Sequence, residues 1–189
     1  MAKKNADVHF QIMEILTAYI RENAPVAEGT HERKPRQDIQ LAFTVIGRRP
    51  PKRIALERLQ KFRLDLNNCD LTRIEGRGFD FAKADFIGTR FVRSQLKNAN
   101  MQYATLVNAN LQHARHLTDA FLRGAALKSI DFTNIPISQD QLELTFGDES
   151  VILPKSLDRP SHWPHEDLSP TLFRHQWRAW HETLPPDGD

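Results

Sequence analysis

Residues 84–114 read ADFIGTRFVRSQLKNANMQYATLVNANLQHA, and this stretch decides the fold. A large apolar residue recurs at every fifth position, and a small residue stands two places before it in each unit. The period of five extends back to Leu64 and forward to about Ile137. The large residues that we expect to face inward are Phe81, Phe86, Phe91, Leu96, Met101, Leu106, Leu111, Leu122 and Leu127.

A period of five is neither the period of a helix nor that of a strand. Positions two apart on an extended chain point the same way, so the small and the large residue of one unit share a face. A straight strand would turn the next pair to the opposite face. The pairs can all point inward only if the chain turns a corner in each unit and winds around its own core. We therefore predict a β-solenoid over residues 64–137, with coils stacked about 4.8 Å apart.

The same run resembles the pentapeptide-repeat family, and in particular its bacterial members with flanking helices. The resemblance implies a right-handed quadrilateral β-helix with four units, or about twenty residues, in each coil. After Leu111 the period slips by one residue, which we interpret as a bulge at a corner. Gly76 leaves an inward position empty, whereas Ile74 and Phe79 overfill positions that favour small residues. We expect the flanking helices to pack at that irregular rim.

Residues 1–63 are expected to form a helical N-terminal segment that ends in a basic linker. Apolar residues at helical spacing predict a helix over residues 8–23. A second helix is predicted from Asp38, as its N-cap, through Arg48. The run RRPPKR at residues 48–53 is interpreted as a stiff basic connector.

Residues 138–189 are expected to form a helical C-terminal cap or tail. Ser138 and Gln141 have the spacing of a capping box, for a short helix that ends near Gly147. Ser169, followed by a proline, opens a final helix with one apolar stripe. This stripe can pack on its own domain, for example as a cap over an open coil edge, or it can dock a partner or a second copy. It consists of Phe173, Trp177, Trp180 and Leu184.

Length and composition indicate one soluble domain with a sizeable core. The 189 residues contain no apolar run of about 18 residues, and the N-terminus lacks the apolar centre of a signal peptide. We therefore expect a cytoplasmic protein without a membrane span. The single cysteine, Cys69, rules out an internal disulfide and is interpreted as a core residue.

Charge is unevenly distributed along the chain, although the net charge is only +2. Residues 1–63 hold 13 Lys and Arg against 7 Asp and Glu, a net of +6. The repeats are close to balanced at +2, and residues 138–189 reach −6. Two interpretations remain open: the acidic segment folds back on basic surface or stays solvated, or the basic end meets an anionic partner.

Sequence motifs of catalysis and cofactor binding are absent, since there is no Gly-rich phosphate loop, CxxC or GxSxG. His162 and His165 lie near Glu166, Asp167 and His175, but a proline interrupts the spacing, so no metal site is predicted. The aspartates of the repeats stand between two inward positions and therefore face outward. We expect no enzymatic activity, no cofactor and no small-molecule substrate.

The remaining function is binding through the outer faces of the coils. At twenty residues per coil, Arg73 stacks on Arg93 and Arg77 on Lys97, while Arg90 lies over an aspartate. We call Arg73, Arg77, Arg90, Arg93 and Lys97 the basic ridge. The sequence favours a scaffold or protein-binding module whose partner it does not name. The alternative is a peripheral module that binds an anionic membrane or nucleic acid through the basic ridge.

DNA mimicry is a third possibility, because known members of the family imitate duplex DNA and bind DNA gyrase. That role requires a long and strongly acidic rod. The repeat region here is short and carries a net charge of +2. Its charge therefore argues against a gyrase-binding DNA mimic.

Overall fold

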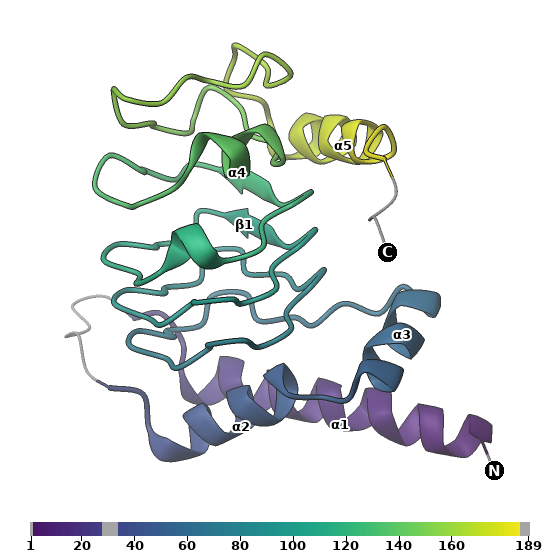
Figure 1. Cartoon of the computed structure of the whole chain (residues 1–189). Helices are drawn as coiled ribbons and strands as arrows, with labels where there is room; N and C mark the ends of the chain where they lie inside the picture. Colours follow the sequence, from purple (N-terminus) through teal and green to yellow (C-terminus); the bar gives the residue numbers. More distant parts are fainter. Residues whose placement is uncertain (1, 28–33, 186–189) are drawn as a thin grey trace.

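The protein is a stack of chain coils, with helices across one end and an irregular segment over the other (Figure 1). A computed structural model describes residues 2–27 and 34–185, with side chains from Asp7 onward. Helix α1 (Ala2–Asn23), α2 (Gln37–Gly47) and α3 (Pro51–Leu59) precede the coils. The coils include β1 (Thr105–Val107), the 3₁₀ helix η1 (Leu117–Asp119) and β2 (Ala126–Lys128), and α4 (Gln139–Glu143) and α5 (Pro170–His181) follow.

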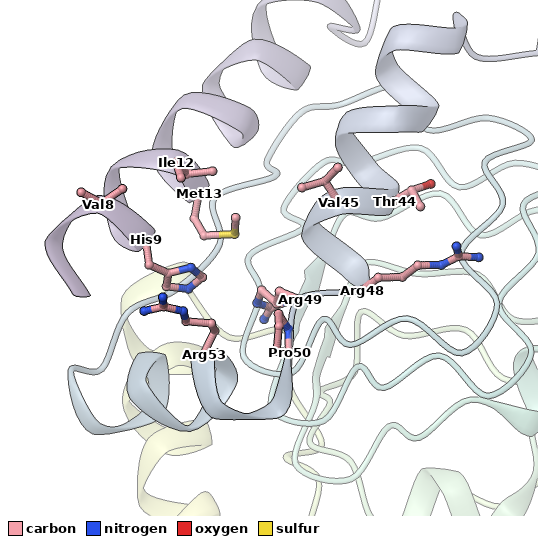
Figure 2. A pocket seen from close by; sticks show the side chains of 10 residues that line it. All are labelled: Val8, His9, Ile12, Met13, Thr44, Val45, Arg48, Arg49, Pro50 and Arg53. Atoms are coloured by element: carbon pink, nitrogen blue, oxygen red, sulfur yellow. The ribbon is translucent and has the colours of Figure 1, made fainter. Parts of the chain in front are cut away.

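Two of the sequence predictions for the N-terminal helices are wrong. Arg36, not Asp38, is the N-cap of α2, and Asp38 lies in the first turn, where it accepts a hydrogen bond from the Tyr19 hydroxyl. The expected connector at residues 48–53 contains the start of α3, because Pro51 sits at the first helical position, where its missing N–H costs nothing. The three helices meet at the start of α3 (Figure 2).

Helix α2 packs into the irregular rim of the coils, as the sequence suggested. Phe43 of α2 stacks on Phe81 with ring centroids 4.4 Å apart. A Cβ atom at Gly76 would lie 3.3 Å from the Phe43 ring. The aromatic ring therefore occupies the space that a side chain at Gly76 would need, and the first coil is completed by a side chain from the helix below it.

Successive coils are joined by parallel backbone bridges. Asp65 pairs with Asp85, and Asp85 pairs in turn with Thr105, so each coil takes twenty residues. β1 and β2 pair in parallel as well. They are the only segments long enough to count as strands within the described residues; the other coils touch through single bridges. The repeats thus adopt a β-helix-type fold.

Each five-residue unit contains a tight turn, which makes the corner. In one such turn the backbone N–H of Ala104 donates to the carbonyl of Met101, 3.1 Å away. Tyr103, the second of the two residues between them, has a φ of 58°. Positive φ at the third position is the signature of type II turns and favours Gly or Asn. The same conformation recurs at five-residue intervals at Asn68, Arg73, Gly78, Lys83, Gly88, Arg93, Asn98, Asn108 and His113.

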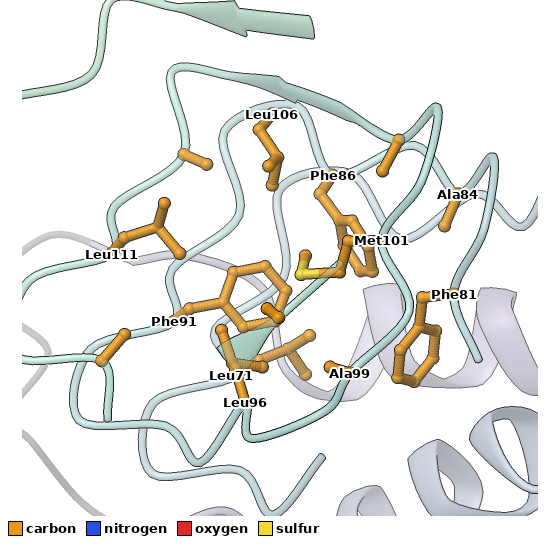
Figure 3. Close-up of a cluster of buried hydrophobic side chains, with 14 of the residues drawn as sticks. Leu71, Phe81, Ala84, Phe86, Phe91, Leu96, Ala99, Met101, Leu106 and Leu111 are labelled. Atoms are coloured by element: carbon orange, nitrogen blue, oxygen red, sulfur yellow. The ribbon is translucent and has the colours of Figure 1, made fainter. Parts of the chain in front are cut away.

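The interior of the coils is filled by side chains (Figure 3). All nine large residues expected to face inward are at most 3% exposed. Three phenylalanines from successive units of one coil meet in its interior, with ring centroids 5.7 Å apart for Phe81 and Phe86 and 5.0 Å apart for Phe86 and Phe91. Edge-to-face pairs of this kind add about 0.5–1.5 kcal/mol each beyond the area that they bury.

The slip in the period occurs at one corner, as predicted. His116 takes a left-handed conformation, with φ of 58°, and η1 follows it. Below the slip Gln95 pairs with Arg115, twenty residues on, whereas above it Asn100 pairs with Phe121, twenty-one residues on. The extra residue is absorbed locally, because Leu122 and later large residues still point inward.

The C-terminal segment closes the far end of the coils. The predicted capping box at Ser138 is present, but α4 ends at Glu143, before the expected Gly147. Trp163 is buried in the main core, and its indole N–H donates to the carbonyl of Thr145 at 2.8 Å. Helix α5 begins after its N-cap Ser169, as predicted, and lies beside the upper coils (Figure 1).

Candidate functional site

The basic ridge lies on the outside of two adjacent coils. Its two columns are in register: the Arg73 N–H donates to the coil above at Val92, and the Gly78 N–H donates to Lys97. Arg77, Arg93 and Lys97 are exposed, whereas Arg73 is half-buried. Side chains of like charge at stacked positions are about 4.8 Å apart at their backbones. The ridge therefore places exposed like charges on adjacent coils.

Arg90 differs from the other members of the ridge. Its guanidinium lies 3.7 Å from the carboxylate of Asp70, in the coil below. The expected internal neutralisation is therefore present, and Arg90 adds little net charge to the ridge.

The apolar stripe of α5 is turned toward the coils rather than toward solvent. Phe173 and Trp177 are buried, and Trp180 and Leu184 are half-buried. The indole N–H of Trp177 donates to the carbonyl of Gly124 at 2.9 Å. Phe146 of the last coils lies under the stripe, with its ring 5.4 Å from Phe173. The helix covers a side face of the coils, and not the open end where the sequence suggested a cap.

An ion cluster built on the buried pair of Lys128 and Asp148, with the exposed Asp167 as its third member, fastens the segment that leads into α5. The Lys128 ammonium donates to both Asp148 and Asp167 at 2.5 Å. Burial raises the pKa of the Asp148 carboxyl, but hydrogen bonds from Lys128, Ser150 and the Leu168 N–H outweigh it and hold that pKa below its ordinary value. Sequence spacing gives no sign of this cluster, because its members are 20 and 39 residues apart.

A second buried ion cluster lies among the N-terminal helices, with side chains from α1, α3 and the connection between α2 and α3. Glu57 of α3 receives two hydrogen bonds from the Arg49 guanidinium, at 2.8 and 2.9 Å, and lies 2.7 Å from the His9 ring. Arg49 also donates to the backbone carbonyl of Asp80 in the coils. One carboxylate thus ties α1 and α3 to the rim of the repeats. The sequence analysis missed all three side chains, since His9 and Glu57 are 48 residues apart.

An open cleft of about 550 Å³ lies beside this cluster, between α1, α2 and the start of α3 (Figure 2). Val8, Ile12 and Met13 form one apolar wall and Val45 the other, and Arg48 and Arg53 stand at its end. The volume is in the range of ligand sites. The sequence predicts the helix over residues 8–23 from its apolar residues, but it gives no sign that one of them, Ile12, lines a cleft.

His162 and the buried Cys69 take structural positions. The His162 ring stacks on Trp180 at 4.9 Å and lies 2.7 Å from the carbonyl oxygen of Thr145. Residues 2–27 and 34–185 hold no cluster of His, Cys, Asp or Glu suited to a metal ion. Cys69 is buried in the core, and burial raises the pKa of its thiol to about 12. The thiol is therefore not the reactive thiolate at neutral pH. In the same described ranges, every helix is too short or too polar to cross a bilayer.

Comparison with protein families identifies the repeat. Residues 80–115 and 91–134 match the model of pentapeptide repeats, with eight copies, and this confirms the resemblance inferred from the sequence. No curated protein matches the chain.

Two solved structures give the same description. A pentapeptide repeat protein from the thylakoid lumen of Arabidopsis thaliana is 21% identical, with a TM-score of 0.31 over 44% of this chain and 74% of that one. A pentapeptide repeat protein from the cyanobacterium Cyanothece is 24% identical, with a TM-score of 0.30. That second alignment covers 48% of this chain and 63%, less than two thirds, of the other.

Proposed function

The chain is a pentapeptide-repeat protein with its repeats at residues 80–134, and on that premise we propose that it is a non-enzymatic scaffold that binds another protein. Proteins with such repeats are generally structural or binding modules. We further propose that the coils form a right-handed, four-sided β-helix. The twenty-residue spacing of the bridges and the turn in each unit support that geometry.

The filled interior carries the functional proposal. Phe86, Phe91 and Leu106 are at most 1% exposed, and together with their neighbours they occupy the space inside the coils. A ligand or partner must therefore bind on the outside, where side chains stand in regular columns. Regular, rigid columns suit recognition of another folded surface, because little conformational freedom of side chains or backbone is lost on binding.

The basic ridge favours one alternative, which is binding to an anionic surface such as a lipid membrane or nucleic acid. Its three exposed members, Arg77, Arg93 and Lys97, stand on adjacent coils. Binding of this kind weakens steeply as salt is raised, whereas a protein interface with an apolar centre is less sensitive. The net charge of +2 over residues 64–137 gives no support to DNA mimicry.

Crosslinking and affinity capture from the native cell test the proposal. The full chain is compared with the triple variant Arg77→Glu, Arg93→Glu, Lys97→Glu and with a charge-matched control, Arg58→Glu, Lys61→Glu, Lys155→Glu, made at exposed positions away from the ridge. We expect one protein partner to be captured by the wild type and by the control. Loss of that partner in the ridge variant alone would place its site on the ridge.

Binding to anionic phosphatidylglycerol vesicles and to duplex DNA, measured over a range of salt, tests the alternative with the same variants. Salt-sensitive binding that only the ridge variant loses, together with no captured protein, would overturn the scaffold proposal. Inhibition of purified gyrase would restore the DNA-mimic hypothesis.

A further inference from the structure

The ion cluster at the C-terminal end holds an amine against a carboxyl group in a shielded place. Lys128 belongs to β2, and Asp148 stands at the matching position of the next coil. Their register follows from the parallel bridge between Ala126 and Phe146. The two side chains are 8% and 0% exposed, and Lys128 Nζ lies 2.5 Å from Asp148 Oδ2. The groups that would make an amide bond are therefore already in contact.

Apolar side chains surround the pair. Phe146, Leu168 and Phe173 are buried in one cluster, and the Lys128 ammonium lies 5.4 Å from the centre of the Phe173 ring. Buried ions carry a desolvation cost that a neutral amide does not carry. Reacting groups that a fold holds in contact also reach effective concentrations of about 10⁵–10⁸ M. Both effects favour condensation of the amine with the carboxyl group.

Hydrogen-bond donors surround the Asp148 carboxyl group as they do in an oxyanion hole. Its Oδ1 accepts from the Ser150 N–H at 3.0 Å and from the Ser150 hydroxyl at 2.5 Å. Its Oδ2 accepts from the Leu168 N–H at 3.1 Å and from the Lys128 ammonium. Donors on Oδ1 stabilise the negative charge that this oxygen gains when a nucleophile adds to the carboxyl carbon. The carboxyl group is thus arranged to accept an attacking amine.

Asp167 is placed to carry a proton. Its Oδ1 lies 2.5 Å from Lys128 Nζ, and its side chain is 70% exposed. A carboxylate in contact with the amine can take a proton from nitrogen and deliver it to oxygen. Burial lowers the pKa of Lys128, but hydrogen bonds to Asp148 and Asp167 outweigh burial and raise that pKa, so the cluster rests as an ion pair. Condensation therefore starts from a small neutral fraction and is slow, which suffices for a bond that forms once in each chain.

We propose that Lys128 and Asp148 condense to an intramolecular isopeptide bond, with Asp167 as the catalytic base and acid. A proton first passes from Nζ to Oδ2. The neutral amine then attacks the carboxyl carbon, so the C–N bond forms and an electron pair of the C=O bond moves to Oδ1. Asp167 takes a second proton from nitrogen and gives it to Oδ2, the C–Oδ2 bond breaks, and water leaves as Oδ1 forms the carbonyl again.

One ammonium and one carboxylate thus become one amide and one water, and the step needs no oxidant, metal or cofactor. The bond is a self-modification that fastens β2 to the next coil, as a disulfide would do in a chain with more than one cysteine. It goes beyond the scaffold function and does not depend on it.

Mass spectrometry of the denatured full chain gives the first test. We expect the wild type, incubated at neutral pH, to be lighter than its sequence mass by one water molecule. Cleavage after glutamates should leave residues 76–143, which hold Lys128, joined to residues 144–149, which hold Asp148. A full sequence mass after prolonged incubation would overturn the proposal and leave the cluster as an ion pair only. A link to residues 167–182 would also overturn it, because Asp167 would then be the acceptor and not the catalyst.

Single substitutions give the second and sharper test. Lys128→Arg keeps the positive charge without an amine that can form this amide, so it should retain its full mass. Asp148→Asn should lose one ammonia in place of one water, because the amide nitrogen leaves from the same carbon. Asp167→Asn, at an exposed position, should fold as the wild type does and slow the loss of water by about a hundredfold or more.

Asp140→Asn, at an exposed carboxylate away from the cluster, is the matched control and should form the bond at the wild-type rate. Circular dichroism of each variant confirms that it is folded. An unchanged rate in Asp167→Asn would refute the role of Asp167 as catalyst. Protein capture by the coil faces is measured independently of these masses, so the two proposals fail separately.

Discussion

The two ends of the coil stack are fastened in the same way, but they differ in the apolar surface that they expose to solvent. At each end a buried ion cluster ties a helical segment to the repeats: Arg49 and Glu57 at the N-terminal end, Lys128 and Asp148 at the C-terminal end. At the C-terminal end the aromatic stripe of α5 is turned inward. At the N-terminal end α1 and α2 send one apolar side into the core and keep a second one exposed.

This difference separates an apolar helix that stabilises its own chain from one that keeps an apolar side exposed. From the sequence alone, the stripe of α5 can either pack on its own domain or dock a partner, and aromatic side chains such as its Trp residues are typical of interfaces. Its contacts with Gly124 and Phe146 show that its large aromatic side chains are already used within the chain. The unused apolar surface consists instead of ordinary aliphatic residues on α1 and α2.

The largest expected effect is loss of the coils on which both ends depend. Leu106→Asp places a carboxylate in a core position that is 1% exposed, and we expect it to destabilise the fold by about 5 kcal/mol or more, enough to unfold the repeats. Asn108→Asp, two residues on at an exposed position, should change stability by less than about 0.5 kcal/mol. Thermal melts followed by circular dichroism compare the two. Equal melts would mean that the inward and outward positions are wrongly assigned.

A smaller effect, confined at first to the N-terminal end, is expected from Glu57→Gln. The substitution leaves the buried Arg49 with Asp80, 3.9 Å away, as its remaining charged partner, and removal of one member of a buried pair costs about 3–5 kcal/mol. Hydrogen exchange should show α1 and α3 opening before the coils. Glu75→Gln, at an exposed carboxylate of the repeats, is the control. Uniform loss of protection along the whole chain would show that the N-terminal helices are not a separate unit.

Deletion of the chain from Ser169 onward tests the C-terminal end. Phe173 and Trp177 each bury a large side chain, so the truncation should lower stability by about 2–4 kcal/mol and expose the apolar surface around Phe146 to association. Leu172→Ala, at an exposed position of the same helix, should have little effect. Size-exclusion chromatography and a thermal melt suffice. A stable, monomeric truncation would show that α5 is a docking element after all.

The smallest effect is a pH dependence specific to the C-terminal end, in chains whose Asp148 carboxyl group is free. The folded-state pKa of Asp148 lies below its unfolded value of about 3.9, so its contribution to stability is complete above about pH 4 and is lost as pH falls through the lower pKa. The melting temperature should fall more steeply in acid for the wild type than for Asp148→Asn. Asp140→Asn, at an exposed carboxylate, should keep the wild-type slope. Parallel slopes for all three proteins would remove Asp148 from the acid response.

The sequence predicts the coils well because their information is local. A period of five identifies the inward residues, the corners and the slip near His116, and the stacking of Arg73 on Arg93 follows from the length of one coil. The cap of α4 at Ser138 and that of α5 at Ser169 also depend on neighbours within three residues.

The parts that could not be predicted depend on packing between distant segments. Asp38 has the residue type of an N-cap, but it bonds to Tyr19, on a helix whose position the sequence does not specify. The cleft beside Ile12 and the pairing of His9 with Glu57 exist only once α1, α2 and α3 are packed together. The cleft and this buried pair therefore have no recognisable signal in the order of the residues.

The slip near His116 has a consequence for the evolution and engineering of the molecule. One additional residue is contained within a single corner, and the coils on either side keep their inward residues and their neighbours. The number of coils in the stack can therefore change without altering the N-terminal or the C-terminal segment. Duplication of residues 85–104 should add one complete coil and move the ends apart by about 4.8 Å. A family of such variants would form a molecular ruler, in which the distance between the two terminal surfaces is set in equal steps.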